Sequence, residues 1–184
     1  MIFRELDLPG AFLLEPERLE DERGFFARTF CRREFEAHGL DPEVVQCSLS
    51  FNRRRGTVRG MHWQGAPAEE AKLVRAVRGA VHDVIVDVRP GSAALGRHAA
   101  VRLDAENRLA LYVPPGFAHG FQTLEDGTEL LYQMSAFHAP EHARGFRFDD
   151  PEVGIRWPLP VAAISERDRG LPSWAELRSR EGRP

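Results

Sequence analysis

Length, composition and charge exclude several classes of protein before any motif is considered. The chain has 184 residues, of which 28 are acidic and 25 basic, so its formal net charge is −3. That balance excludes a nucleic-acid-binding protein with a strongly basic surface, and a hydrophobic content of 42% excludes a chain that is disordered throughout. The length predicts one domain over residues 1–184.

Cysteine content and hydropathy bear on the compartment. The only cysteines, Cys31 and Cys47, are too few for a disulfide framework and favour a reducing compartment, so we expect a cytoplasmic protein. No apolar run approaches the roughly 18 residues of a membrane-spanning helix, and no membrane partner is expected.

The N-terminal third is polar and carries mixed charge, over 15–23 and again over 25–38. Within the second stretch, residues 31–38 predict a short helix that ends at Gly39. Gly56 marks a change of pattern, because short runs with strand-like alternation follow it.

Several short strands are expected after Gly56. Residues 73–78 and 80–88 form two such runs, and Gly79 permits a turn between them. Further runs cover 101–103, 109–113, 116–124 and 130–137. Short strands at regular spacing, in a chain with 16 glycines and 13 prolines, predict a closed antiparallel barrel or sandwich. A helix is expected over 174–178, with frayed residues from 179 to 184.

One hairpin signature suggests chemistry. The segment 114–119, Pro-Pro-Gly-Phe-Ala-His, matches the P-x-G-x-x-H pattern of the cupin family, in which Pro and Gly fix a turn and the histidine points into the barrel. A tight hairpin with a buried, hydrogen-bonded histidine is the alternative explanation. Metal-binding cupins carry a companion H-x-H, but here His62 is followed by Gln64, a poor transition-metal ligand. Glu69 and Glu70 are expected to be solvated, so no metal is expected.

Motifs along almost the whole chain resemble the dTDP-4-dehydrorhamnose 3,5-epimerase family, from about residue 2 to 175. The matching segments are 21–26 (DERGFF), 59–64 (RGMHWQ), 72–74 (KLV), 83–89 (DVIVDVR), 115–121 (PGFAHGF), 131–132 (LY), 149–151 (DDP), 155–158 (IRWP) and 164–168 (ISERD). The resemblance implies an antiparallel jelly-roll (cupin) barrel with short peripheral helices. It also implies a homodimer that needs no cofactor and acts on a nucleotide-diphosphate 4-keto-6-deoxyhexose.

The implied reaction explains the residue types at four positions. Hydrogens on C3 and C5 of such a sugar are both α to the C4 ketone, so epimerisation needs a base, an acid on the opposite face and a cation for the enolate oxygen. By resemblance His62 is the base, Asp168 its hydrogen-bond partner, Lys72 the cation and Tyr132 the opposite-face acid. Lys72 is the only lysine in the chain. A phenol serves as this acid if neighbouring groups lower its pKa.

Other positions match contacts to substrate in the family. Arg23 and Arg59 correspond to the diphosphate contacts, since guanidinium groups suit phosphate oxygens, and His119 is expected near the ketone. Gln46 is retained. Thymidine-specific relatives differ from this chain at Arg28, Ser48, His138 and Ala143, where they carry glutamate, asparagine, tyrosine and glutamate. Because of these departures, the identity of the nucleotide is left open. It is also left open whether C3, C5 or both are inverted.

Three functions therefore compete on sequence grounds. The first is a cofactor-free epimerase of a nucleotide-linked 4-keto-6-deoxy sugar. The second is a cupin that binds sugar nucleotides without catalysis, and the third is a metal-dependent cupin oxygenase or isomerase, against which Gln64 argues.

Overall fold

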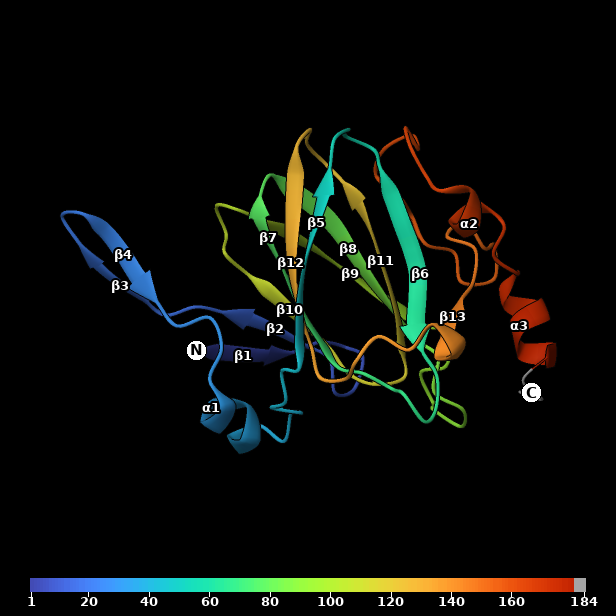
Figure 1. Ribbon diagram of the computed structural model, residues 1–184, viewed down its shortest axis with the longest axis horizontal. Helices are drawn as coiled ribbons and strands as arrows, with labels where there is room; N and C mark the ends of the chain where they lie inside the picture. The colour runs from blue at the N-terminus through green and yellow to red at the C-terminus, as the bar shows by residue number, and fades with distance from the viewer. Residues whose placement is uncertain (181–184) are drawn as a thin grey trace.

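Two antiparallel sheets face each other and form the body of the protein (Figure 1). The structure is a computed structural model that describes residues 1–180. The first sheet has, in spatial order, the strands β1 (Ile2–Glu5), β2 (Phe12–Glu15), β10 (Ala110–Val113), β7 (Lys72–Arg78), β12 (Thr128–Met134) and β5 (Gln46–Asn52). The second has β13 (Ala143–Gly145), β6 (Val58–Gln64), β11 (Phe117–Thr123), β8 (Ala80–Asp87) and β9 (His98–Asp104). The predicted antiparallel jelly-roll of the cupin type is confirmed.

The N-terminal third contains more strand than its sequence indicated. Five strands precede Gly56, including the hairpin of β3 (Arg18–Asp21) and β4 (Gly24–Ala27), which extends away from the body at the left of Figure 1. Both strands of this hairpin are exposed along most of their length, so they lack the apolar alternation that marks a strand packed on a core. Placing the onset of strands at Gly56 was therefore wrong.

Helices are short and peripheral, as expected. The helix predicted over 31–38 is α1 (Arg32–Ala37), and Gly39 follows it with a φ of 69°. The predicted C-terminal helix is α3 (Trp174–Arg180), which ends two residues later than expected. Of the residues expected to be frayed, 181–184 lie outside the described residues. The remaining helical turns are η1 (Pro140–His142) and α2 (Glu166–Arg169). Within residues 1–180, no helix is long and apolar enough to cross a bilayer.

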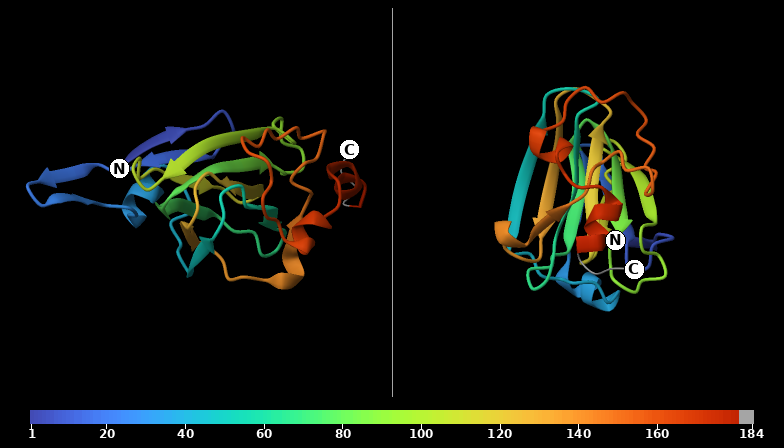
Figure 2. Two further views of the ribbon diagram at one scale, coloured as in Figure 1. Left: turned by 90° about the horizontal axis from the view of Figure 1, so that it is seen from above. Right: turned by 90° about the vertical axis from the view of Figure 1, so that its right-hand side faces the viewer.

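Strand alternation directs side chains either between the sheets or outward. On β8, Val81 and Ile85 belong to the core between the sheets, whereas Val84 and Val86 belong to a second cluster on the outer face of the five-stranded sheet. The C-terminal segment covers that outer face, with Phe146, Val153 and Trp174 packed in the same cluster (Figure 2). This docking brings α2 next to β6.

Candidate active site

A pocket of about 570 Å³ opens between the two sheets. That volume lies in the range that accommodates a small organic ligand. All four residues predicted to be catalytic line it, namely His62, Lys72, Tyr132 and Asp168. Of the predicted substrate-binding residues, Ser48, Arg59, His119 and His138 also line it. Sequence positions spread over 120 residues thus converge on one cavity.

Opposite sheets supply the two sides of this cavity. His62 on β6 and His119 on β11 are register partners in the five-stranded sheet. Lys72 on β7 and Tyr132 on β12 belong to the six-stranded sheet, where β12 pairs with β7. Because alternate residues of a strand share a face, Lys72 lies on the same side of β7 as the core residues Val74 and Ala76. The pocket is therefore the polar end of the space that the core fills elsewhere.

Close approach of two strands fixes the backbone next to His62. Gly60 has a φ of 128°, and a Cβ built there would lie 2.6 Å from the Cα of Gly120 on β11. Only glycine fits such a position without displacing the backbone. The N–H of Gly60 in turn donates to Oδ2 of Asp168 at 3.3 Å. This stretch of β6 is thus tied to α2.

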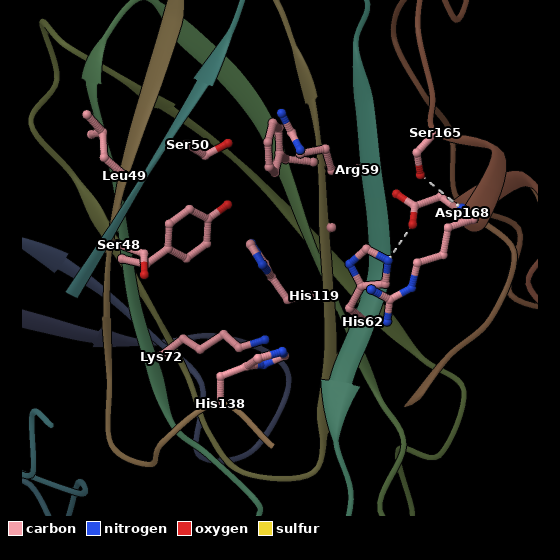
Figure 3. Close-up of a pocket in the computed structure, with 14 residues that line it drawn as sticks. Ser48, Leu49, Ser50, Arg59, His62, Lys72, His119, His138, Ser165 and Asp168 are labelled. Atoms are coloured by element: carbon pink, nitrogen blue, oxygen red, sulfur yellow. Dashed lines mark hydrogen bonds and ion pairs between the residues drawn. The ribbon is translucent and has the colours of Figure 1, made fainter. Parts of the chain in front are cut away.

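His62 and Asp168 form a hydrogen-bonded pair, drawn as a dashed line in Figure 3. The distance from His62 Nε2 to Asp168 Oδ1 is 2.8 Å. The Asp168 side chain is 6% exposed and the His62 side chain 37%, so the carboxylate lies behind the imidazole and the imidazole faces the cavity. Ser165 caps α2 by accepting a bond from the N–H of Asp168 at 3.0 Å, which holds the carboxylate in place.

The environment of Asp168 favours its ionised form. Burial raises the pKa of this carboxyl group, but hydrogen bonding to His62, the charge of His62 and the N–H of Gly60 act in the opposite direction, and the net pKa lies below its usual value. A carboxylate that stays ionised fixes the tautomer of His62 and stabilises the imidazolium that forms if His62 takes a proton.

A second histidine–aspartate pair lies deeper. His119 Nε2 and Asp83 Oδ1 are 2.8 Å apart, and both side chains are buried. The ring of His119 meets the ring of Tyr132 edge-on, with 5.9 Å between centroids. Burial raises the pKa of the Tyr132 phenol, the charge of Asp83 raises it further, and Arg59 opposes the shift only in part. The condition stated for Tyr132 as an acid, a pKa lowered by its neighbours, is therefore not met, and the phenol stays protonated.

Lys72 has an ion-pair partner that the sequence reasoning placed in solvent. Its Nζ lies 3.1 Å from Oε1 of Glu70, and the Glu70 side chain is only 10% exposed. Glu69 is exposed, as expected, but the same expectation for Glu70 was wrong. Alternation within a polar loop gives no signal for burial, so only the fold distinguishes these two glutamates.

Gln64, at the position of the second histidine in metal-binding cupins, is bonded to backbone. Its amide nitrogen donates to the carbonyls of Ala68 and Phe137, at 2.9 and 3.2 Å, and its oxygen accepts from the N–H of Ala139 at 2.6 Å. The Gln64 side chain thus connects the segment at Ala68 to the segment at 137–139 by hydrogen bonds. Among residues 1–180 there is no cluster of three histidine, cysteine or carboxylate side chains that suits a metal ion.

Three predicted binding residues lie outside the pocket of this chain. Arg23 is at the tip of the projecting hairpin, 84% exposed and paired with Asp21. Arg28 follows the hairpin and pairs with Glu34 at 3.1 Å. Gln46 acts indirectly, because its side-chain oxygen accepts the N–H of His138 at 2.6 Å. The hairpin thus holds both arginines away from the cavity of their own chain.

Sequence reasoning missed some residues of the site. Arg167 lines the cavity next to Asp168, and Ser50 lines it beside Ser48. Among 24 arginines nothing distinguishes Arg167 except its place in the segment 164–168, which would have been the signal. Asp83 was part of a matching segment but received no role, although its contact with His119 is as short as that between His62 and Asp168.

Comparisons with known proteins agree with this geometry. The family model described as dTDP-4-dehydrorhamnose 3,5-epimerase matches residues 5–176. A dTDP-4-dehydrorhamnose 3,5-epimerase of Sinorhizobium fredii is 42% identical over 178 residues, covering 96% of this chain and 91% of that protein. The structure of the rmlC epimerase of Mycobacterium tuberculosis matches with a TM-score of 0.93 and 36% identity, covering 100% of this chain and 94% of the other.

A second similar structure is that of an enzyme named for a narrower activity. ChmJ, a 3'-monoepimerase from Streptomyces bikiniensis in complex with dTDP-quinovose, matches with a TM-score of 0.87 and 36% identity, over 96% of this chain and 89% of that one. Near-complete coverage by the family model and by relatives above 30% identity confirms the resemblance read from the motifs. The chain belongs to the dTDP-4-dehydrorhamnose 3,5-epimerase family, a family of isomerases.

Proposed function

We propose that this protein epimerises a dTDP-linked 4-keto-6-deoxyhexose at carbons adjacent to the ketone, through an enolate. The observation that carries the proposal is the pairing of His62 with buried, ionised Asp168 at one side of a cavity that Lys72 and Tyr132 line from the opposite sheet. A base and an acid on opposite sides of one ring are what inversion of a carbon centre requires. The Sinorhizobium fredii relative is named as an epimerase of dTDP-4-dehydrorhamnose, which is such a sugar.

Each of these side chains has one role in the proposed reaction. His62 removes a hydrogen from C3 or C5, and its imidazolium is stabilised by Asp168. The electron pair moves onto the C4 oxygen, where the ammonium of Lys72 stabilises the negative charge. Tyr132 delivers a proton to the opposite face of the same carbon. Its raised pKa makes the phenol a weaker acid than usual, but it is still a stronger acid than a carbon adjacent to a ketone. His119 donates toward the ketone or a neighbouring hydroxyl, and no cofactor takes part.

Deuterium exchange tests this proposal. In heavy water, the wild-type protein should exchange hydrogen at C3, C5 or both in dTDP-4-keto-6-deoxyglucose, and NMR identifies the carbon that is labelled. His62→Ala should lower exchange by about 10²- to 10⁴-fold, the usual contribution of a general base. Tight binding by the wild type with no exchange at either carbon would instead favour a non-catalytic binding protein.

The nucleotide specificity is part of the proposal. The departures at Arg28, Ser48, His138 and Ala143 make a thermal-shift comparison of thymidine, guanosine, cytidine and uridine diphosphates informative, since a ligand that binds the native state raises the melting temperature. We expect thymidine diphosphate to give the largest shift. A larger shift with another base would correct the nucleotide and leave the chemistry unchanged.

We further propose a homodimer in which the projecting hairpin reaches the pocket of the partner. Leu19 and Phe26 on the hairpin are 70% and 73% exposed, and on β5, the strand at one edge of the six-stranded sheet, Leu49 and Phe51 are 60% and 48% exposed. Exposed apolar side chains of this size are typical of an interface. A second copy that covers them would also carry Arg23 and Arg28 toward a cavity whose wall includes β5. The cytoplasmic location expected from the free cysteines stays a prediction.

Mixing inactive variants tests the shared site. Light scattering should give a mass of about twice 20.8 kDa. If Arg23 acts across the dimer, Arg23→Ala mixed and re-equilibrated with His62→Ala should recover about a quarter of wild-type activity, because half the dimers are mixed and one site in each is complete. No recovery in a mixture shown to contain mixed dimers would contradict the shared site.

A further inference from the structure

A partly buried ion pair lies at the edge of the pocket, between the side chains of two residues that are two positions apart in the sequence. Glu70 Oε1 and Lys72 Nζ are 3.1 Å apart, and their side chains are 10% and 13% exposed. Lys72 lines the cavity, but Glu70 does not. We infer that Glu70 is a positioning residue that holds the Lys72 ammonium where the enolate oxygen forms, an inference that rests on the function proposed above.

The loop that carries Glu70 is itself fixed. The N–H of Ala71 donates to Oγ of Ser135 at 2.9 Å, and the N–H of Ser135 donates to the carbonyl of Ala71 at 3.0 Å. On the other side of Glu70, the carbonyl of Ala68 accepts from the Gln64 side chain at 2.9 Å. Backbone anchors therefore flank Glu70 on both sides, and its carboxylate acts as a fixed point.

A lysine side chain depends on such an anchored partner to define where its charge lies. Its ammonium is a compact charge at the end of four rotatable bonds, so a long side chain alone does not define where the charge lies. Within residues 1–180, Glu70 is the one carboxylate in ion-pair contact with Lys72. The arrangement mirrors the opposite side of the cavity, where Asp168 orients His62 from behind while the imidazole faces the ligand space.

Figure 3 shows what lies in front of Lys72. Its ammonium and the ring of His138 point toward one another at the bottom of the cavity, and His119 lies between Lys72 and His62. Without a partner behind it, the ammonium would be free to turn toward any acceptor that enters with the ligand. Since electrostatic stabilisation of a transition state depends on charges that are already in place, release of Lys72 should slow the chemical step more than it weakens binding.

The test separates positioning from structural support. In the deuterium-exchange assay, Glu70→Ala should lower kcat by about 10- to 100-fold, the cost of a misplaced catalytic group, and should change KM by less than about twofold because Glu70 does not line the cavity. The matched control is Glu69→Ala, the exposed neighbour, which should match the wild type. A loss through KM alone, or an equal loss in Glu69→Ala, would overturn the inference.

A double-mutant cycle tests whether Glu70 acts through Lys72. Exchange by Lys72→Met should be slow, and adding Glu70→Ala should slow it no further. If Glu70→Ala costs the same factor in both backgrounds, Glu70 only supports the loop, and the inference is wrong.

Two milder variants provide the test if Glu70→Ala does not fold. Glu70→Gln keeps the length of the side chain and an acceptor oxygen, so it should retain most of kcat. Glu70→Asp has a shorter side chain, which moves the carboxylate oxygen away from the Lys72 ammonium, so it should lose activity as Glu70→Ala does. Active Asp and inactive Gln would show that charge rather than position matters, against the inference. A wild type that fails to exchange contradicts the proposed function, whereas a wild type that exchanges no faster than Glu70→Ala contradicts only this inference.

Discussion

Asp168→Asn isolates the contribution of one carboxylate to the proposed base. In the wild type, Oδ1 accepts from His62 at 2.8 Å and Oδ2 accepts from the N–H of Gly60 at 3.3 Å. An asparagine has one oxygen for these two donors. If the oxygen faces His62, the amide nitrogen opposes the N–H of Gly60; if it faces Gly60, the amide donates to His62 and stabilises the tautomer that carries its proton on the cavity side.

The expected magnitude follows from the bond that is lost. A hydrogen bond to a charged group contributes about 1.5–3 kcal/mol, and the low exposure of Asp168 leaves little screening by water. Because about 1.4 kcal/mol corresponds to a tenfold change in rate, exchange should slow by about 10- to 150-fold. The loss should appear in kcat, since the imidazolium forms only during the reaction.

The assay is deuterium incorporation followed by NMR, with a melting curve for each variant. Asp149→Asn is the matched control, because it makes the same change on an exposed carboxylate of the same C-terminal segment and should leave exchange unchanged. Exchange by folded Asp168→Asn at the wild-type rate would refute the argument that this carboxylate orients and stabilises the base.

Three further outcomes are expected. Tyr132→Phe should still incorporate deuterium, since His62 can return the label to the face it came from, but net inversion should fall much further; equal losses would contradict the role of Tyr132 as opposite-face acid. Gly60→Ala should lower the free energy of unfolding by about 2–5 kcal/mol, because alanine is strained at a positive φ and its Cβ would collide with Gly120. An unchanged urea midpoint would contradict this and would show that the two strands can move apart at no cost. The folded-state pKa of Asp168 is lowered, so its contribution to stability is present above the unfolded-state pKa of about 3.9 and is lost as pH falls through the lower folded value. The difference in urea midpoint between wild type and Asp168→Asn should therefore narrow below about pH 4, whereas a constant difference down to pH 3 would argue against the shift.

The fold could be predicted where strands are rich in apolar residues that pack on a core. The runs that became β7 and β8 contribute such residues to the buried clusters, β8 from both of its faces, and Gly79 turns between them with a φ of 68°. The hairpin of β3 and β4 could not be predicted in this way, since neither of its faces packs on the core of its own chain. Alternation reports burial within a chain and gives no signal for a strand that projects from it.

The motif segments predicted most of the residues that line the cavity. The features that they did not predict depend on the fold. His62, Lys72, Tyr132 and Asp168 line one cavity as the motifs implied. The partial burial of Glu70 and the raised pKa of Tyr132 were not predictable, because both depend on which groups the sheets bring close in space. A pKa is a property of surroundings, and the surroundings of Tyr132 include Asp83 from the opposite sheet.

The C-terminal segment that packs on the five-stranded sheet couples folding to activity. His62 and Asp168 are 106 positions apart, so their contact exists only after this segment has docked on the barrel. Contacts of such long sequence separation carry a large loop-closure cost and tend to form late. A barrel without the docked segment would retain Ser48, Lys72, His119 and Tyr132, yet the proposed base His62 would lack its orienting partner. An incompletely folded chain would thus deprotonate substrate slowly, and full turnover would require that the last part of the polypeptide has docked.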